Sequence, residues 1–430
     1  MVCTPEPFGP RLRALRVAKG LSLSEFARRL YYSKGHVSRI ETGATQPSLE
    51  FARRCDAELG AEGALAAHLE SSGSAHDIGP EPAQDDDGVW IMAMAPDGAS
   101  SMVPVGRRDM LAGGAALLAS LAGQRVRRPE TGADQFEYHT RLLASARGLG
   151  QVAQPEAVLP MVVGQAQALR VLAQQVRGKD ARAVATLSAR TAEFAGWMAQ
   201  EAGDDRMAMW WTGRAAHVAA HVGDQQAATY ALVRKALITM YQGDARSTIS
   251  LARRAQATQG VSARVLSLAA QREAQGRALV GDYDACFRAL DTARRHLDVA
   301  AAADSSALVI GTSFVPDPVA AVTGWCLYDL GRPAEAAAVL EKEVARIDPG
   351  AFRARTRFGI RLALAHAAAG EVDRACAVAA LMLGHATTIS SATLRADLRR
   401  LSATLRRFSH HPAVRELTPA FAMALHPGTA

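Results

Sequence analysis

The sequence predicts an all-α protein built from more than one domain. Its 430 residues leave room for two or three domains of roughly 150 residues each. Hydrophobic residues make up 49% and charged residues 21%, which is an ordinary globular composition. Alanine is abundant, whereas β-branched runs and strand-like alternation are scarce. Helices are therefore expected nearly everywhere.

Charge divides the N-terminal part of the chain into two segments. Residues 1–54 carry ten basic and four acidic side chains. Residues 55–105 carry ten acidic side chains and no Lys or Arg. A basic segment followed by an acidic one indicates a domain that faces a polyanion and a connector that does not.

The first domain, residues 1–70 (the head), reads as four or five short helices from residue 8 onward. Gly20 is placed to end the first helix. The stretch "SLSE", Ser22 to Glu25, is a capping box that starts the second. Ser33 is placed to cap a third helix, and "QPS" (46–48) precedes a fourth.

The second and third of these helices are predicted to cross closely. Ala27 is small enough to allow the crossing, and Val37 and Ile40 are apolar on the side that would meet it. A helix held in this way presents its other face to solvent, where it can enter the major groove of DNA and contact base edges. That face carries Lys34, Gly35, His36, Ser38 and Arg39.

The head resembles the Cro/repressor-type helix-turn-helix family, also called the XRE family, over about 55 residues. The matching stretches are "LRALRVAKGLSLSEFARRL", "YSKGHVSRIETG" and "QPS". The resemblance implies a lambda-repressor-like fold that binds double-stranded DNA. The base-reading positions would fall on Lys34, Gly35, His36, Ser38 and Arg39, with Arg39 contacting a guanine. Phosphate contacts would fall on Arg13, Ser22, Ser33, Thr42, Thr45 and Gln46.

Two residues depart from the family pattern. Leu23 stands where members often have Gln or Glu at the DNA edge, so that contact is expected to be missing. Tyr31 stands where the family usually has a glycine in a left-handed turn, which strains a bulky residue. We expect Tyr32 to pack over the small core and Tyr31 to turn its hydroxyl toward the DNA backbone. A helical bundle without a DNA role is the alternative interpretation of the head.

Residues 71–105 are predicted to be an acidic flexible linker, since Gly, Pro, Ser and Asp dominate them. Within them "VWIMAMA" (89–95) is a short apolar segment that either docks on a neighbouring domain or forms a strand-like piece. Arg107-Arg108 precede an apolar run and resemble a twin-arginine export signal, although they lie far from the N-terminus. The other interpretation of 105–123 is an amphipathic helix, since the run is too short for a membrane span.

Residues 106–430 contain a repeated glycine turn. Gly243, Gly281, Gly331 and Gly370 are spaced by 38, 50 and 39 residues, and a degenerate copy surrounds Gly203. A helix rich in Leu, Ala and aromatic residues precedes each turn, and another helix follows. A period slightly above 34 in helix–turn–helix units resembles the tetratricopeptide family, which implies an α-solenoid.

Other candidate sites have weaker support. His217 and His221 lie four residues apart but lack the carboxylate of a HExxH metal site, so a surface or packed pair is favoured. Trp210 and Trp211 could line a ligand groove of the solenoid or belong to its core. The five cysteines show no metal spacing and are expected to be small buried hydrophobes. No catalytic motif is found, so we expect no enzyme activity, cofactor or metal.

Together these features predict a cytoplasmic, nucleoid-associated transcription regulator that binds specific DNA as a homodimer and contacts no membrane. The solenoid would serve dimerisation and the sensing of a peptide, a small molecule or a protein. The layout resembles regulators of the actinobacterial type whose sensor domains are tetratricopeptide-like. The alternative is an interaction scaffold of the tetratricopeptide type, which its head merely tethers to DNA.

Overall fold

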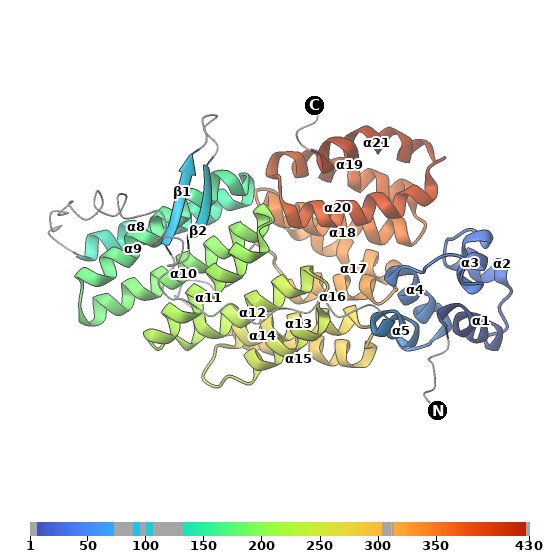
Figure 1. The fold of residues 1–430 in the computed structure, drawn as a ribbon, viewed down its shortest axis with the longest axis horizontal. Helices are drawn as coiled ribbons and strands as arrows, with labels where there is room; N and C mark the ends of the chain where they lie inside the picture. The colour runs from blue at the N-terminus through green and yellow to red at the C-terminus, as the bar shows by residue number, and fades with distance from the viewer. Residues whose placement is uncertain are drawn as a thin grey trace.

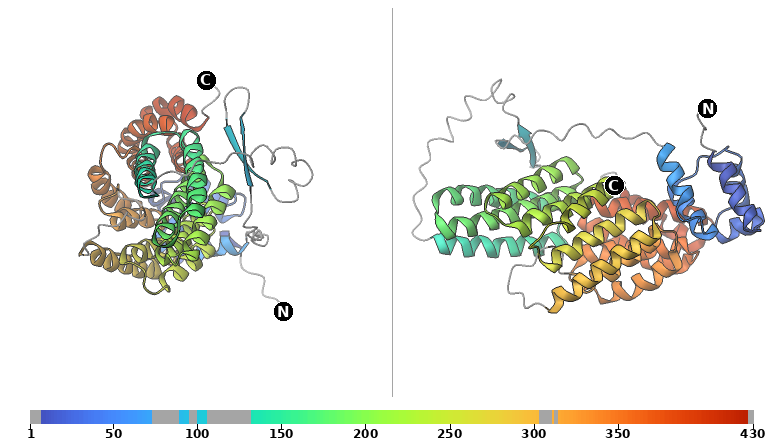
Figure 2. Two further views of the ribbon diagram at one scale, coloured as in Figure 1. Left: turned by 90° about the vertical axis from the view of Figure 1, so that its left-hand side faces the viewer. Right: turned by 90° about the horizontal axis from the view of Figure 1, so that it is seen from below.

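The computed structural model describes residues 7–72, 89–94, 100–105, 132–302, 311 and 314–426. The head consists of five short helices at one end of the molecule (Figures 1 and 2). They are α1 (Phe8–Ala18), α2 (Leu23–Arg29), α3 (Lys34–Glu41), α4 (Leu49–Leu59) and α5 (Ala64–Ser72).

The helix starts of the head follow the predicted caps. Hydroxyls of Ser22, Ser33 and Ser48 accept hydrogen bonds from the amides of Glu25, His36 and Phe51, three residues further on in each case. These bonds satisfy amide groups that a helix leaves unpaired at its first turn. The small core beneath is continuous and includes the predicted crossing residues: Leu12, Phe26, Ala27, Leu30, Val37, Ile40 and Phe51 are all buried.

A short β-hairpin follows the head in the chain. Strand β1 (Val89–Met94) pairs with strand β2 (Ser100–Val105) in antiparallel register, with Ile91 opposite Val103. Residues 89–94 of the predicted apolar segment thus form a strand, one of the two outcomes expected for it. Val105 of the predicted helix belongs to β2, whereas residues 106–123 and the rest of the predicted linker after Ser72 lie outside the described residues.

The rest of the described chain is a stack of antiparallel helix pairs, as the predicted solenoid requires (Figure 1). We refer to it as the repeat domain. Its helices are α8 (Gly132–Val152), α9 (Pro155–Gln175), α10 (Gly178–Ala202), α11 (Asp205–His221), α12 (Gln225–Tyr241), α13 (Ala245–Gln256), α14 (Ala263–Leu279), α15 (Tyr283–Ala302), α16 (Pro318–Asp329), α17 (Pro333–Arg346), α18 (Phe352–Ala368), α19 (Val372–Ile389), α20 (Ala392–Leu405) and α21 (Pro412–Leu425), with a 3₁₀ turn at Arg406–Phe408.

Each glycine of the predicted rhythm lies between the two helices of a pair. Gly203, Gly243, Gly281, Gly331 and Gly370 all have positive φ, which ends the first helix in a left-handed residue. Asp204, Asp244 and Asp282 follow directly and cap the second helix through their carboxylates. The longest spacing, between Gly281 and Gly331, contains the 20-residue helix α15 and the segment that leads to Pro318.

The repeat domain has an inner layer of helices and is closed on itself. The first helices of successive pairs, α10, α12, α14, α16, α18 and α20, contact one another along its length. In addition α8 contacts α18, and α10 contacts α20, so its beginning meets its end. Four of the cysteines are free and buried, as expected, and Cys3 lies outside the described residues. In the part of the chain that the structure describes, no helix has the length and apolar character that crossing a membrane requires.

Candidate nucleic-acid interface

Helix α3 turns most of its predicted base-reading residues outward. Val37 and Ile40 are fully buried against the head core, so the opposite face is open. Lys34, Gly35 and Arg39 are exposed, and Ser38 is half-exposed. The Arg39 guanidinium lies over Gly35, since a Cβ placed on that glycine would be 3.5 Å from Arg39 Nη1. The guanidinium therefore lies on the exposed face of the helix, where the absence of a side chain at position 35 leaves room for it.

His36, also a predicted base-reading residue, is half-buried. Its ring stacks on Tyr32 at 5.1 Å between centroids and meets Phe51 edge-on at 5.8 Å. Burial, with help from Arg39 and from Arg407 of the repeat domain, lowers the pKa of His36. The imidazole is thus part of the aromatic edge of the head core, at the border of the outward face. Tyr32 packs over the small core, as expected.

An ion pair that the sequence gave no sign of fixes the far end of α3. Arg16 of α1 contacts Glu41 with two bonds, Nε to Oε1 at 2.6 Å and Nη2 to Oε2 at 2.9 Å. A third bond joins Arg16 Nη1 to the carbonyl of Leu21 at 2.7 Å. This bidentate geometry raises the pKa of Arg16, mainly through the bond to Glu41. It holds α3 against α1 independently of the apolar contacts.

The predicted phosphate contacts are accessible on the head. Arg13, Ser22, Ser33 and Gln46 are exposed, and Thr45 is half-exposed. The hydroxyl of Thr42 donates to carbonyls of the last turn of α3, at 3.0 Å and 3.2 Å.

The capping box at the start of α2 is only half formed. Ser22 accepts the amide of Glu25 at 3.1 Å, but the Glu25 carboxylate pairs with Arg29 at 2.8 Å. Arg29 also donates to Glu58 of α4 at 3.0 Å, so Glu25 takes part in a network that joins α2 to α4. The backbone amide at Ser22 is thereby left accessible to other acceptors.

The head matches a known family of domains. Residues 7–69 match a family model described as a helix-turn-helix domain. The head is a helix-turn-helix domain. Among solved structures, the crystal structure of Bacillus thuringiensis PlcR in complex with the peptide PapR7 and DNA is similar at 14% identity and a TM-score of 0.30. The match covers 79% of this chain and 93% of that chain. No curated protein sequence matches this chain.

Tyr31 of the helix-turn-helix turn faces the repeat domain, which corrects the expectation that it turns toward DNA. Its φ of 57° is left-handed, as the family glycine predicted. Its ring lies against Gly370, where an added Cβ would overlap it, and the Arg54 guanidinium lies 5.7 Å from its centre. The strained turn is thus held by contacts with the glycine turn between α18 and α19.

The head rests on successive glycine turns of the repeat domain (Figure 1). The backbones of Gly63 and Gly281 meet so closely that neither has room for a Cβ. Gly331 lies equally close to the carbonyl of Arg53 on α4. Two hydrogen bonds add to these contacts, from Arg53 to the carbonyl of Leu279 and from Arg407 to Glu50 at 2.7 Å. We call this interface between the head and the glycine turns the seat of the head.

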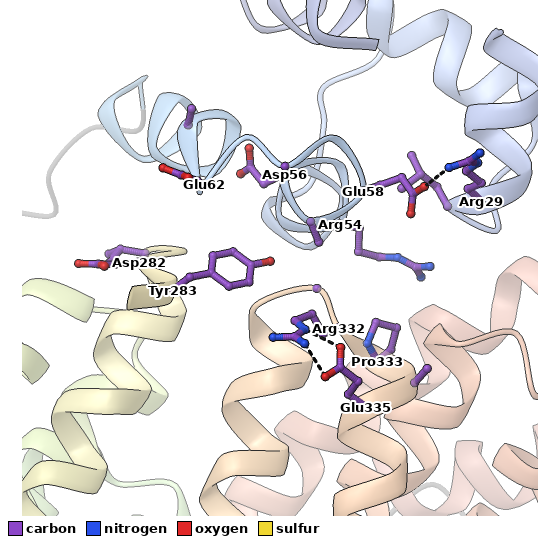
Figure 3. Close-up of a pocket in the computed structure, with 18 of the residues that line it drawn as sticks. Arg29, Arg54, Asp56, Glu58, Glu62, Asp282, Tyr283, Arg332, Pro333 and Glu335 are labelled. Carbon is purple, nitrogen blue, oxygen red and sulfur yellow. Dashed lines mark hydrogen bonds and ion pairs between the residues drawn. The ribbon is translucent and has the colours of Figure 1, made fainter. Parts of the chain in front are cut away.

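A cleft of about 830 Å³ remains between the head and these turns. Figure 3 shows Arg54, Asp56 and Glu62 of the head on one side and Tyr283 and Arg332 of the repeat domain on the other. Although the head contacts the glycine turns, the surface of the head that faces the repeat domain is therefore partly accessible to solvent.

We expect Gly370→Ala to loosen this seat. The added Cβ would displace the Tyr31 ring, whereas Gly243→Ala adds the same group at the same φ of 80° with nothing within 4 Å. Both substitutions should cost about 1–2 kcal/mol of stability, since alanine is strained in this conformation. Only Gly370→Ala should change the distance between fluorescent labels on α1 and α21. An equal change in both variants would contradict the seat.

Asp56 should give the head an unusual pH dependence. It is buried and accepts the amides of Leu65 and Ala66, each at 2.9 Å, so it caps α5 from α4. Burial raises its pKa from 3.8 to about 6, against the effect of those two bonds. The folded protein then binds this proton more tightly than the unfolded chain. Stability from this group therefore rises, by on the order of 2 kcal/mol, as the pH falls from about 6 to 4. Unfolding of wild type and Asp56→Asn should show the difference only in that window, and parallel profiles would refute it.

Trp210 and Trp211 follow the second of the two expected outcomes, packing with the core of the repeat domain. Trp211 is 6% exposed and belongs to the core of α9, α10 and α11, and Trp210 packs against that core. Their rings meet edge-on at 4.8 Å. Their helical spacing reflects core packing, with Trp211 buried and Trp210 half-buried against the same core.

Proposed function

We propose that this protein is a cytoplasmic, nucleoid-associated transcription regulator that binds specific double-stranded DNA through α3. The observation that carries the proposal is the outward face of α3 within a helix-turn-helix domain. That face holds Lys34, Ser38 and Arg39, whereas Val37 and Ile40 on the opposite side of the helix are buried in the head core. Residues 1–54 add an excess of basic side chains, which favours a polyanion partner.

A homodimer on two half-sites about one helical turn apart is part of the proposal. A single head of this size buries little area on DNA, so one copy gives weak specificity. The repeat domain would supply the dimer contact and sense a peptide, a small molecule or a protein. The seat of the head on the glycine turns supports this, because a change in the repeat domain would be passed to the head.

Selection of bound sequences from a random duplex pool tests the function. The full chain should enrich one motif with two half-sites, and mapping of bound sites across the genome should recover the same motif. Binding should weaken steeply with salt because phosphate contacts release counterions. Enrichment of no motif would refute a sequence-specific regulator.

Deletion of residues 1–72 separates the regulator from a scaffold. A regulator should lose its DNA sites and its effect on transcription together, whereas partner binding by the repeat domain would persist. If the cellular effect survives the deletion, the repeat domain acts as an interaction scaffold and the head only tethers it.

A further inference from the structure

The inner helices of the repeat domain enclose a cavity of about 170 Å³ that is strongly basic. Helices α8, α10, α12, α14, α16 and α18 all contribute to its lining. Among the described residues, Glu193 is the one acidic side chain that lines it. Five arginines do so: Arg147, Arg234, Arg272, Arg353 and Arg357.

Four of these arginines are engaged by the protein itself. Arg353 and Arg357 pair with Glu201, which lies behind the cavity wall. Arg234 donates to Gln200 at 3.0 Å and lies 3.4 Å from Glu193. Arg147 donates to the carbonyl of Gly311 at 3.0 Å. Each of these four guanidinium groups therefore has a hydrogen-bond or ion-pair partner within the protein.

Arg272 is different. No hydrogen bond or ion pair joins it to another described residue. The groups that act most strongly on its charge are Tyr230, Tyr241, Arg234 and Cys326, none of them a carboxylate. Burial lowers the pKa of its guanidinium to about 10, so it keeps its charge at neutral pH. A charge held among helices without a counter-ion is costly, and an anion in the cavity would remove that cost. The hydroxyl of Tyr241, which also lines the cavity, has no hydrogen-bond partner and could donate to the same anion.

The remainder of the lining is aromatic. Trp197, Tyr230, Phe314, Trp325 and Phe358 surround the arginines, and Leu268 and Val322 add aliphatic surface. An inorganic anion would leave these rings without contact. A carboxylate attached to an aromatic or aliphatic group would use both parts of the lining.

We propose that this cavity binds a carboxylate that carries an apolar group, with Arg272 as the counter-ion and the aromatic side chains around the apolar part. The inference rests on the proposed function, because it names the chemistry that the repeat domain would sense. Ligand pockets commonly hold roughly 300–1,000 Å³, so the smaller volume here suits a small acid or the C-terminal residue of a peptide.

Isothermal titration of the full chain without DNA tests the proposal with four probes. Phenylacetate and the peptide Gly-Gly-Gly-Gly-Phe with a free carboxylate carry the proposed group. Phenylacetamide and the same peptide with a C-terminal amide lack its charge. Binding of phenylacetate identifies a free acid as sufficient, whereas binding of the peptide acid alone identifies a chain terminus. In either case the matching amide should bind at least tenfold more weakly, because a charge-assisted bond is lost.

Arg272→Met provides the matching variant, since it keeps an unbranched side chain and removes a charge that costs stability. It should fold and lose at least tenfold in affinity for the carboxylate. Arg277→Met is the control, because Arg277 lies on the same helix and pairs with Glu273 and Asp282 away from the cavity. The proposal is overturned if neither acid binds at millimolar concentration, if acids and amides bind alike, or if Arg272→Met binds as wild type. Motif selection without ligand tests the proposed function separately, so the two failures are distinguishable.

Discussion

Glu201→Gln is expected to destabilise the repeat domain by about 3–5 kcal/mol. Glu201 is 1% exposed and receives Arg353 at 3.0 Å and Arg357 at 2.6 Å. It also accepts from Trp197 at 3.1 Å and from the hydroxyls of Ser391 and Thr393. The amide would leave the buried guanidinium of Arg353 and the mostly buried guanidinium of Arg357 without their carboxylate. The loss should appear as a lower midpoint in chemical denaturation of the full chain.

This carboxylate matters because it closes the repeat domain. Glu201 ends α10, whereas Arg353 and Arg357 lie on α18 and Thr393 on α20. Arg353 extends the link to α8 and its end, through the carbonyls of Gly150 and Ala153, each at 2.7 Å. Loss of one charge should therefore loosen the contact between the first and last parts of the stack.

Glu137→Gln is the matched control for this substitution. Glu137 makes a surface pair with Arg141 at 3.8 Å with both side chains about 70% exposed, so its loss should have no measurable effect. Equal stability of Glu201→Gln and Glu137→Gln would contradict the closure.

The same cluster has a pH signature. Burial opposes the ionisation of Glu201, but Arg357, Arg353 and two hydroxyls outweigh it and lower its pKa from 4.5 to about 2. The stability that Glu201 contributes is thus complete above pH 4.5 and is lost as the pH falls toward 2. Glu201→Gln should remove that part of the acid unfolding profile.

Arg39→Ala is expected to abolish specific DNA binding and to leave the fold intact. The side chain is exposed on α3 and makes no hydrogen bond or ion pair with another side chain among the described residues. A bidentate arginine–guanine contact is worth about 1–3 kcal/mol. In a symmetric dimer the loss occurs twice. Affinity for the selected motif should fall toward that for random duplex, as measured by fluorescence anisotropy at fixed salt.

Arg39→Lys distinguishes a base contact from a phosphate contact. Lysine keeps the charge but not the planar fork, so a base contact should be lost and a phosphate contact largely kept. If both variants protect the motif as wild type does in footprinting, α3 reads the DNA with other residues or does not read it.

The local rules of the chain were sufficient to predict the parts of the head. Ser22, Ser33 and Ser48 cap helices because their hydroxyls reach amides three residues away. The periodic glycines end helices because their positive φ excludes most other residues. Such signals are read within a few positions, and the same holds for the core residues Val37 and Ile40.

The groups that join distant segments could not be predicted in this way. Glu201 contacts residues more than 150 positions away, and Arg272 gains its significance from side chains on several other helices. In the sequence, each of the two residues looks like an ordinary charged residue on the solvent-exposed side of a helix. Tyr31 was expected to turn toward DNA, and its packing against Gly370 corrects that expectation. The stacking of His36 on Tyr32 was not predicted either.

The sequence by itself determined the helical class, the helix-turn-helix head, the glycine-turn repeats and the outward residues of α3, because periodicity, caps and turn residues act over short distances. Only the tertiary structure decided which turns the head rests on, how the repeat domain closes and where an arginine is left without an acid. Those outcomes depend on the angle by which each helix pair is rotated relative to the preceding pair in the stack. Small rotations accumulate along the stack and bring together side chains that no local pattern relates.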